Sequence, residues 1–136
     1  MHILILSPFL PHPPNWGFGK RVYHLLEVLS RSHSVSLLTY ADDRDAQSIQ
    51  ALRAICVGVH TVPNRPLRFG KRFAQLLSVV STVSFQRRAT DNPEMQQKLD
   101  ELTRGEPFDI IQVESSQMAG FRFDRRSVLV LSLIHI

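Results

Sequence analysis

The chain has 136 residues, 43% of them hydrophobic, which is enough for one domain with a buried core and too little for two. Sixteen basic and twelve acidic side chains give a formal net charge of +4. This excess indicates anionic partners only weakly, and we expect no nucleic acid among them.

Cys56 is the only cysteine, which excludes an internal disulfide and fits a cytoplasmic compartment. The amino terminus lacks signal-peptide features and no apolar run approaches the roughly 20 residues of a membrane span, so we expect a soluble product.

The first thirty residues predict a strand, a stiff loop and a helix. Residues 2–6 are apolar after His2, which is typical of a strand buried on both faces of a parallel sheet. Four prolines between residues 8 and 14 then exclude a helix or a sheet interior. The helical pattern that follows has the spacing of one buried face, with Val22, Leu25, Leu26 and Leu29.

The start of this helix is a candidate anion site. The first turn of a helix carries free N–H groups and a partial positive charge, and glycines allow a ligand to approach the backbone. We predict that Gly17, Gly19, Lys20 and Arg21 bind a phosphate or another part of a substrate. The alternative is that the glycines only form the turn and that the two basic side chains are solvated.

The later segments continue the alternation of strands and helices. Strands are predicted over residues 34–40, 55–62 and 108–114, and a fifth apolar run begins near Ser127. Asp42 is the predicted N-cap of a short helix, and Asn92 and Pro93 open a longer one that ends at Gly105. This order predicts an α/β fold, a Rossmann-like parallel sheet with helices on both faces.

A basic segment interrupts this order between Arg65 and Arg88. It has no acidic residue, and its apolar positions recur at helical spacing. A basic amphipathic helix can lie on an anionic membrane surface. The alternative is that the apolar stripe belongs to the core and the arginines form an exposed rim.

In an open parallel sheet the ligand crevice lies beyond the carboxyl ends of the strands, where the winding direction reverses. We therefore expect the loop after the first strand to face Glu114 and the loop that follows it. Glu114 is a candidate to bind hydroxyls or to take a proton, and the alternative is a capping or solvated glutamate. His12 and His24 are near, but no spacing of His, Cys and acidic residues indicates a metal site.

A dinucleotide fingerprint is a second interpretation of the glycines. Gly17 and Gly19 supply its first two positions, and Asp42 or Asp43 follows the second strand. However, Val22 occupies the third position, and a long proline-rich loop replaces the tight turn. A phosphate loop is excluded because Arg21 follows Gly19 and Lys20 where Ser or Thr is required.

Several motifs occur in an order that resembles the amino-terminal domain of family 4 glycosyltransferases, which have the two-domain GT-B fold. An apolar strand ends in Ser-Pro, and three further motifs follow: Pro13-Pro14-x-x-Gly17-x-x-x-Arg21-x-Tyr23-His24-Leu25-Leu26, His33-x-Val35-x-Leu37-Leu38-Thr39 and Phe108-Asp109-Ile110-Ile111-Gln112-Val113-Glu114. The likeness covers nearly the whole chain up to about Val130.

The resemblance implies retaining transfer of a sugar from a nucleotide-diphosphate-sugar to a glycan or lipid-linked acceptor, without a cofactor. The acceptor would be bound mainly by this domain and the donor by a second domain. The glycine loop of the family maps onto residues 17–21, although Trp16 stands at a glycine position and Arg21 at a histidine position. Gln112 and Glu114 stand where relatives often have histidines, so the catalytic residue is unknown and Glu114 is the candidate.

The last six residues, Leu131 to Ile136, depart from the family and look like a translated sequencing adapter. We therefore expect residues 1–130 to be an incomplete amino-terminal domain and residues 131–136 to be a non-native tail, with chance as the alternative.

The parent protein is expected in the cytoplasm, or at the inner face of the cell membrane, and this chain alone is expected to be inactive. Two other functions stay open: a non-catalytic α/β module that binds an anion or a membrane, and a nucleotide-dependent oxidoreductase.

Overall fold

The structure of the chain is a computed structural model, and it describes residues 1–64 and 92–132. The predicted membrane-binding segment between Arg65 and Arg88 lies outside the described residues, as do residues 133–136. The strands are β1 (His2–Ser7), β2 (Ser34–Tyr40), β3 (Gly58–Val62), β4 (Ile110–Glu114) and β5 (Val128–Ser132). The helices are α1 (Gly17–Ser30), α2 (Ala46–Arg53) and α5 (Pro93–Gly105), with two short 3₁₀ turns, η1 (Asp43–Asp45) and η2 (Ser116–Met118).

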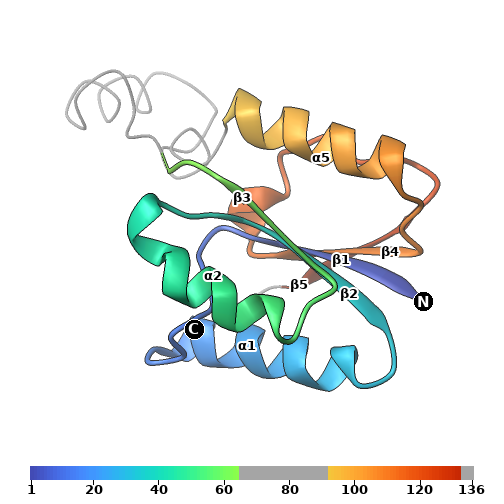
Figure 1. Ribbon diagram of the computed structural model, residues 1–136. Coiled ribbons are helices and arrows are strands. Elements are labelled where there is room, and N and C mark those ends of the chain that lie inside the picture. Colours follow the sequence, from blue (N-terminus) through green and yellow to red (C-terminus); the bar gives the residue numbers. More distant parts are fainter. Residues whose placement is uncertain (65–91, 133–136) are drawn as a thin grey trace, which may run out of the picture.

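The five strands form one parallel sheet in the order β3-β2-β1-β4-β5. β1 is the central strand, and its Ile3 lies opposite Val35 of β2 and Ile110 of β4. The chain winds outward from β1 to β3 and then returns to the other side of β1 (Figure 1). The α/β Rossmann-like prediction is confirmed, and the winding direction reverses between the first and fourth strands.

Helices cover both faces of the sheet, with α1 and α2 on one face and α5 on the other (Figure 1). Successive side chains of a strand point to opposite faces, so alternate residues of β1 belong to two separate cores. One core joins β1 to α1 and α2 through Ile3, Ile5, Val22, Leu26 and Leu52. The other joins β1 to α5 through Leu4, Leu6, Met95 and Leu99. Leu25 and Leu29, predicted as buried, are half-buried against the first core.

The predicted helix boundaries are largely confirmed. The Asn92 side chain accepts a hydrogen bond of 2.8 Å from the backbone N–H of Glu94, and α5 ends at Gly105 as predicted. After Asp42 the chain first forms η1, in which the Asp45 carboxylate accepts a hydrogen bond of 2.8 Å from the Asp42 N–H, and α2 follows.

Two strands begin later than the apolar pattern predicts. β3 begins at Gly58 because the N–H groups of Ile55 and Cys56 still bond to the Leu52 carbonyl at the end of α2. β4 begins at Ile110, although Phe108 is buried in the core on the α5 side. An apolar run therefore marks burial here, and the regular strand occupies only part of it.

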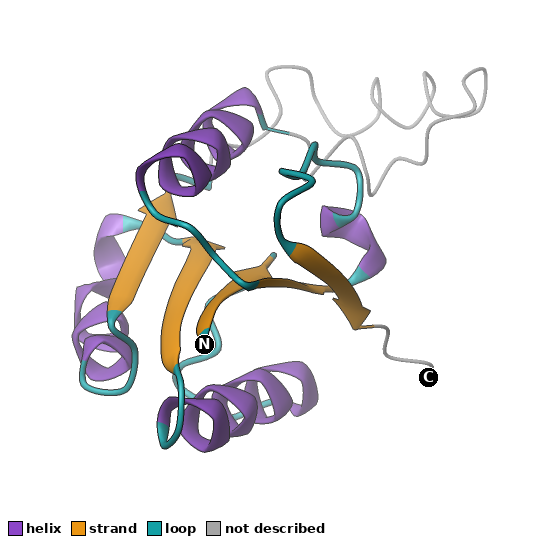
Figure 2. Cartoon of the chain, turned by 90° about the vertical axis from the view of Figure 1, so that its right-hand side faces the viewer, coloured by secondary structure: helices purple, strands orange, loops and turns teal. Residues whose placement is uncertain are grey.

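β5 is the edge strand of the sheet, on the side away from α2 (Figure 2). Both of its faces are accessible to solvent, since Val128, Leu129, Val130 and Leu131 are all exposed. Leu131 and Ser132, which belong to the predicted non-native tail, pair with Val113 and Glu114. Strand pairing does not report where a sequence came from, so the origin of this tail stays a prediction.

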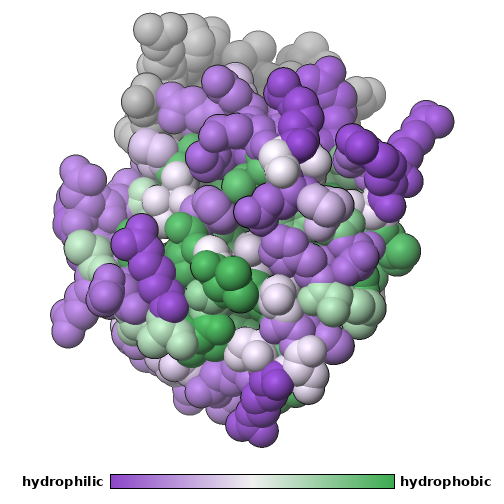
Figure 3. Space-filling view, turned by 45° about the vertical axis from the view of Figure 1, so that its right-hand side comes forward, coloured by the Kyte–Doolittle hydropathy of each residue, from purple (hydrophilic) through white to green (hydrophobic). Residues whose placement is uncertain are grey.

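The surface turned forward in Figure 3 is mostly polar, with an apolar area near its centre. Within residues 1–64 and 92–132, no helix has both the length and the hydropathy needed to cross a bilayer.

Substitution of Leu4 by Ala is expected to lower the free energy of unfolding by about 3 kcal/mol, because it leaves a cavity beneath α5. Val28→Ala is the control, since Val28 lies on the exposed side of α1 and its truncation is expected to change stability by no more than about 0.5 kcal/mol. Urea unfolding followed by circular dichroism measures both. Equal losses in the two variants would contradict the assigned core.

Burial raises the pKa of the Cys56 thiol to about 11. As the pH rises from 9 towards 11, the thiol of the unfolded chain ionises while that of the folded chain keeps its proton, so stability falls with pH in this window. Over that interval the wild-type chain is expected to lose up to about 2 kcal/mol more than Cys56→Ala. Urea midpoints measured across the window test this, and parallel pH profiles for the two proteins would contradict it.

Candidate functional site

The loop after β1 and the end of β4 lie at the same rim of the sheet. β1 and β4 are adjacent and parallel, and Leu6 lies opposite Val113 near their carboxyl ends. Residues 8–16 then lead along this rim to the start of α1 (Figure 1). The predicted meeting of these two segments is therefore present in the fold.

Arg21 and Glu114 join the two segments directly. The Arg21 guanidinium donates from Nη2 to Oε2 of Glu114, and the Gln112 amide donates from Nε2 to Oε1 of Glu114 at 2.6 Å. Gln112 and Glu114 are two residues apart on β4, so both side chains lie on the sheet face that α1 covers. Arg21 lies one turn into α1, within reach of that strand end.

The carboxylate of Glu114 is fully buried, whereas the side chain of Arg21 is 38% exposed. A buried carboxylate costs several kcal/mol unless it is paired and hydrogen-bonded, and here both of its oxygens accept a hydrogen bond. The arrangement suits a carboxylate that holds a guanidinium in place. It does not present Glu114 to solvent as a free base, which is the chemistry that the sequence suggested for it.

Two serines complete the surroundings of this pair. Arg21 Nη1 also donates to Oγ of Ser132 at 2.9 Å, but Ser132 falls in the predicted non-native tail, so no role is built on it. Ser115, directly after Glu114, has a φ of 91°, a left-handed conformation that costs a non-glycine residue on the order of 1 kcal/mol. Its hydroxyl accepts a hydrogen bond of 3.3 Å from the Gln117 N–H, which caps η2. This turn could not be predicted from the sequence, because a glycine is the usual residue at a positive φ.

The four residues predicted to bind an anion share the first turn of α1 but differ in access. A Cβ atom added at Gly17 would meet no atom within 4 Å, so the space there is open. Lys20 is exposed, and its N–H donates to the Trp16 carbonyl at 2.9 Å. By contrast, a Cβ atom at Gly19 would lie 2.8 Å from Nε1 of Trp16, so the indole covers this glycine. Arg21 is bound to Glu114.

Three aromatic side chains gather at the same place, and the sequence analysis did not single them out. Trp16 stacks on Phe18 with ring centroids 5.3 Å apart, and Phe9 meets both rings edge-on at 5.5 and 5.9 Å. The Arg21 guanidinium carbon lies 5.9 Å from the centroid of Phe18. Phe9, Trp16 and Phe18 are called the aromatic cluster below. Phe9 and Trp16 belong to the proline-rich loop and Phe18 to the first turn of α1, and the path of the loop brings the three rings together.

The histidines near the rim have ordinary partners. His12 Nδ1 lies 3.1 Å from the Ser48 hydroxyl, and His24 pairs with Glu27 on the exposed side of α1. Among the described residues no group of three or more His, Cys, Asp and Glu side chains could hold a metal ion.

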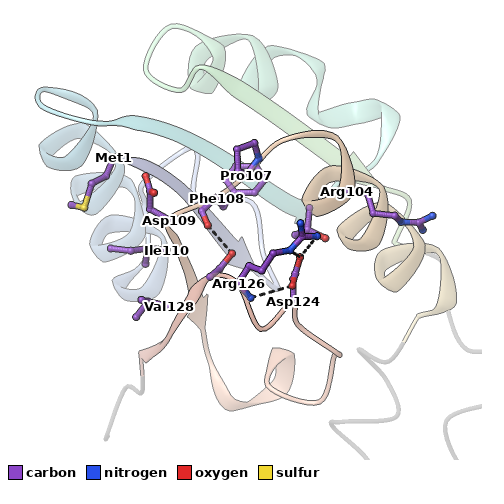
Figure 4. A pocket seen from close by; sticks show the side chains of 11 residues that line it. Met1, Arg104, Pro107, Phe108, Asp109, Ile110, Asp124, Arg126 and Val128 are labelled. Carbon is purple, nitrogen blue, oxygen red and sulfur yellow. Dashed lines mark hydrogen bonds and ion pairs between the residues drawn. The ribbon is translucent and has the colours of Figure 1, made fainter.

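A cavity of about 680 Å³ lies at the opposite rim, between the end of α5 and the amino ends of β4 and β5. Arg126 and Asp124 point towards each other in its wall (Figure 4), and the hydrogen bonds from Arg126 lower the pKa of the Asp124 carboxyl. Asp109 accepts a hydrogen bond of 2.7 Å from the His2 N–H. Open α/β sheets bind their ligands beyond the carboxyl ends of the strands, so the candidate site is assigned to the other rim and not to this cavity.

Replacing Arg21 by Ala is expected to lower the free energy of unfolding by roughly 2 kcal/mol, since it leaves the Glu114 carboxylate buried without a cation. The loss is smaller than the roughly 3 kcal/mol or more typical of fully buried pairs, because water already reaches part of Arg21. Lys20→Ala, the adjacent exposed cation, is the control and is expected to be nearly neutral.

The double variant Arg21→Ala with Glu114→Gln is expected to be more stable than Arg21→Ala alone, because it removes the uncompensated charge. Urea denaturation of the wild-type chain, of the single variants Arg21→Ala and Glu114→Gln and of the double variant gives the coupling energy. Strictly additive losses would show that the two side chains do not depend on each other.

Comparison with known proteins adds no family to this geometry. No family model, curated protein or solved structure matches the chain. What the rim can do is therefore inferred from its own residues.

Proposed function

We propose that the chain is the acceptor-side half of a glycosyltransferase with the two-domain GT-B fold. In this proposal the parent protein moves a sugar, with retention, from a nucleotide-diphosphate-sugar to a glycan or lipid-linked acceptor. The chain alone lacks the donor half and does not turn over. The fold, a Rossmann-like parallel sheet, is necessary for this function but common to many others.

The observation that carries the proposal is the contact between Arg21 and Glu114 across the reversal of the sheet. Ligands of open α/β sheets bind beyond the carboxyl ends of the strands at this point. Here that rim holds a fixed guanidinium, an exposed lysine and the first turn of α1, with no acidic residue in that turn. Each of these features favours a negatively charged group, such as the diphosphate of the donor or the diphosphate oxygen on which charge develops as the sugar departs.

In this mechanism Arg21 is the binding group and Glu114 is a positioning residue. Departure of a nucleoside diphosphate builds negative charge on its oxygens, and a cation fixed in advance stabilises that charge without having to reorganise. Glu114 accepts a hydrogen bond from the guanidinium, and Gln112 in turn donates to the other oxygen of Glu114, so the carboxylate that holds Arg21 is itself held in place. The Arg21 side chain stays partly exposed. A sugar acceptor approaching the same rim would be oriented against the donor, which is the other main source of rate in group transfer.

The oxidoreductase interpretation is less well supported by the same residues. A dinucleotide pyrophosphate needs close access to the backbone at the glycines of the first turn. The Trp16 indole lies over Gly19, and nine residues separate Ser7 from the first residue of α1. A tight strand-to-helix turn is therefore absent from this part of the chain.

The test is to recover the coding sequence downstream of this chain, express the complete protein and measure nucleoside diphosphate release from a panel of nucleotide sugars. Release that depends on an acceptor is expected. Arg21→Ala should lower kcat/KM on the order of 100-fold, the loss typical of one preorganised donor to a developing charge. Val28→Ala, on the exposed side of α1, is the control and should leave kcat/KM unchanged.

Three results would each contradict a part of the proposal. No release from any nucleotide sugar would remove the transferase function. Full activity of a folded Arg21→Ala protein would remove the role of this residue while leaving the function in place. Transfer by the 136-residue chain alone would show that it is not a half-site.

A further inference from the structure

The aromatic cluster is exposed at the rim that the proposed function uses. Phe9 and Trp16 are 46% and 41% exposed, large fractions for side chains of this size. Isolated exposed aromatic residues need no explanation, but three rings in mutual contact form a continuous apolar surface. Neither the packing of the two cores nor the Arg21 and Glu114 pair requires Phe9 or Trp16 to be there.

The rings are held in place before any ligand arrives. Each of the three contacts the other two, with one stacked pair and two edge-on pairs. Phe9 is also fixed through its backbone, because its carbonyl accepts a hydrogen bond of 2.6 Å from the Ser7 hydroxyl. The loop between Phe9 and Trp16 contains three prolines, which limit its freedom. A surface fixed in advance loses little entropy on binding.

Gly19 is part of this arrangement. A Cβ atom at position 19 would lie only 2.8 Å from Nε1 of the Trp16 indole, and Gly19 is buried. The φ of Gly19 is not positive, so the backbone conformation does not demand a glycine. The missing side chain therefore serves to seat the indole against α1, beside Phe18.

We propose that Phe9, Trp16 and Phe18 form a stacking platform for a pyranose ring of the acceptor, with Gly19 as the positioning residue that seats Trp16. This inference rests on the proposed function and names the part of the acceptor that this side of the site binds. A pyranose ring has a face of polarised C–H bonds and a rim of hydroxyl groups. The electron-rich face of an aromatic ring attracts such C–H groups, as it attracts the positive edge of another ring.

The polar groups beside the cluster fit the hydroxyl rim. The Arg21 guanidinium lies over the ring of Phe18. Its Nε is buried, but Nη1 and Nη2 each have one N–H beyond those that donate to Ser132 and Glu114. Lys20 is exposed on the same turn. An apolar floor with a few placed donors is the usual composition of a small-molecule site.

Trp16 is the only tryptophan of the chain, so its fluorescence reports on the platform alone. The 136-residue chain is titrated with a panel of methyl pyranosides, including neutral and N-acetylated hexosides. At least one is expected to change the emission of Trp16 with millimolar affinity. Saturation-transfer NMR should then show contact through the C–H protons of that sugar.

Three variants give the test its controls. Phe9→Ala removes one exposed ring and should raise the dissociation constant about two- to tenfold, the range for a single aromatic contact. Gly19→Ala should shift the emission of the free protein, because it displaces the indole, and should weaken binding as well. Val28→Ala on the same helix should match the wild-type chain. Far-ultraviolet circular dichroism checks that each variant is folded.

In the binding assay two outcomes contradict the platform. One is the absence of both an emission change and saturation transfer for every glycoside. The other is an emission shift produced by anionic phosphatidylglycerol vesicles and by no sugar, which would assign the rings to a membrane. The assay contains no nucleotide sugar, so its result is independent of transfer. If Phe9→Ala leaves the activity of the complete protein unchanged, the platform is contradicted and the transferase function is not. If the chain binds a sugar but the complete protein transfers none, the transferase function is contradicted and the platform is not.

Discussion

The pairing of β1 with both β2 and β4 is the constraint on which the rest of the structure depends. Because β1 is central and buried on both faces, it places α1 on one side of the sheet and α5 on the other. Parallel pairing also brings the carboxyl ends of β1 and β4 to one rim. The meeting of Arg21 with Glu114 follows from this order of strands, since the two residues are 93 positions apart in the chain.

Patterns with a strong local cause could be predicted from the sequence. The apolar run of β1, the cap at Asn92 and the helix end at Gly105 each depend on residues within a few positions of one another, and the structure has all three. The parallel order could be predicted as well, because alternating strands and helices leave few other arrangements. The predicted start of β3 at Ile55 was wrong, because the N–H groups of Ile55 and Cys56 donate to the Leu52 carbonyl at the end of α2 and not to a neighbouring strand.

The chemistry of the rim was harder to predict, because side chains decide it across long separations. Glu114 can be placed at the crevice from its position at the carboxyl end of a strand, but its contacts with Arg21 and Gln112 could not be predicted, because they form only in the packed sheet. The glycines can be found from the sequence, but the indole that covers one of them cannot. The result is a site in which the carboxylate is an internal support and the cation is the group that faces outward. The sequence predicted an anion-binding Arg21 as well, so only the expectation of an accessible Glu114 carboxylate changes.

The sheet ends on a strand whose outer edge and both faces are open. β5 carries four exposed apolar side chains in a row, and a parallel strand is normally covered on both faces. Such a margin is a template on which one copy of the chain can extend the sheet of another. We therefore expect the fraction of monomer to fall as the concentration of the chain rises.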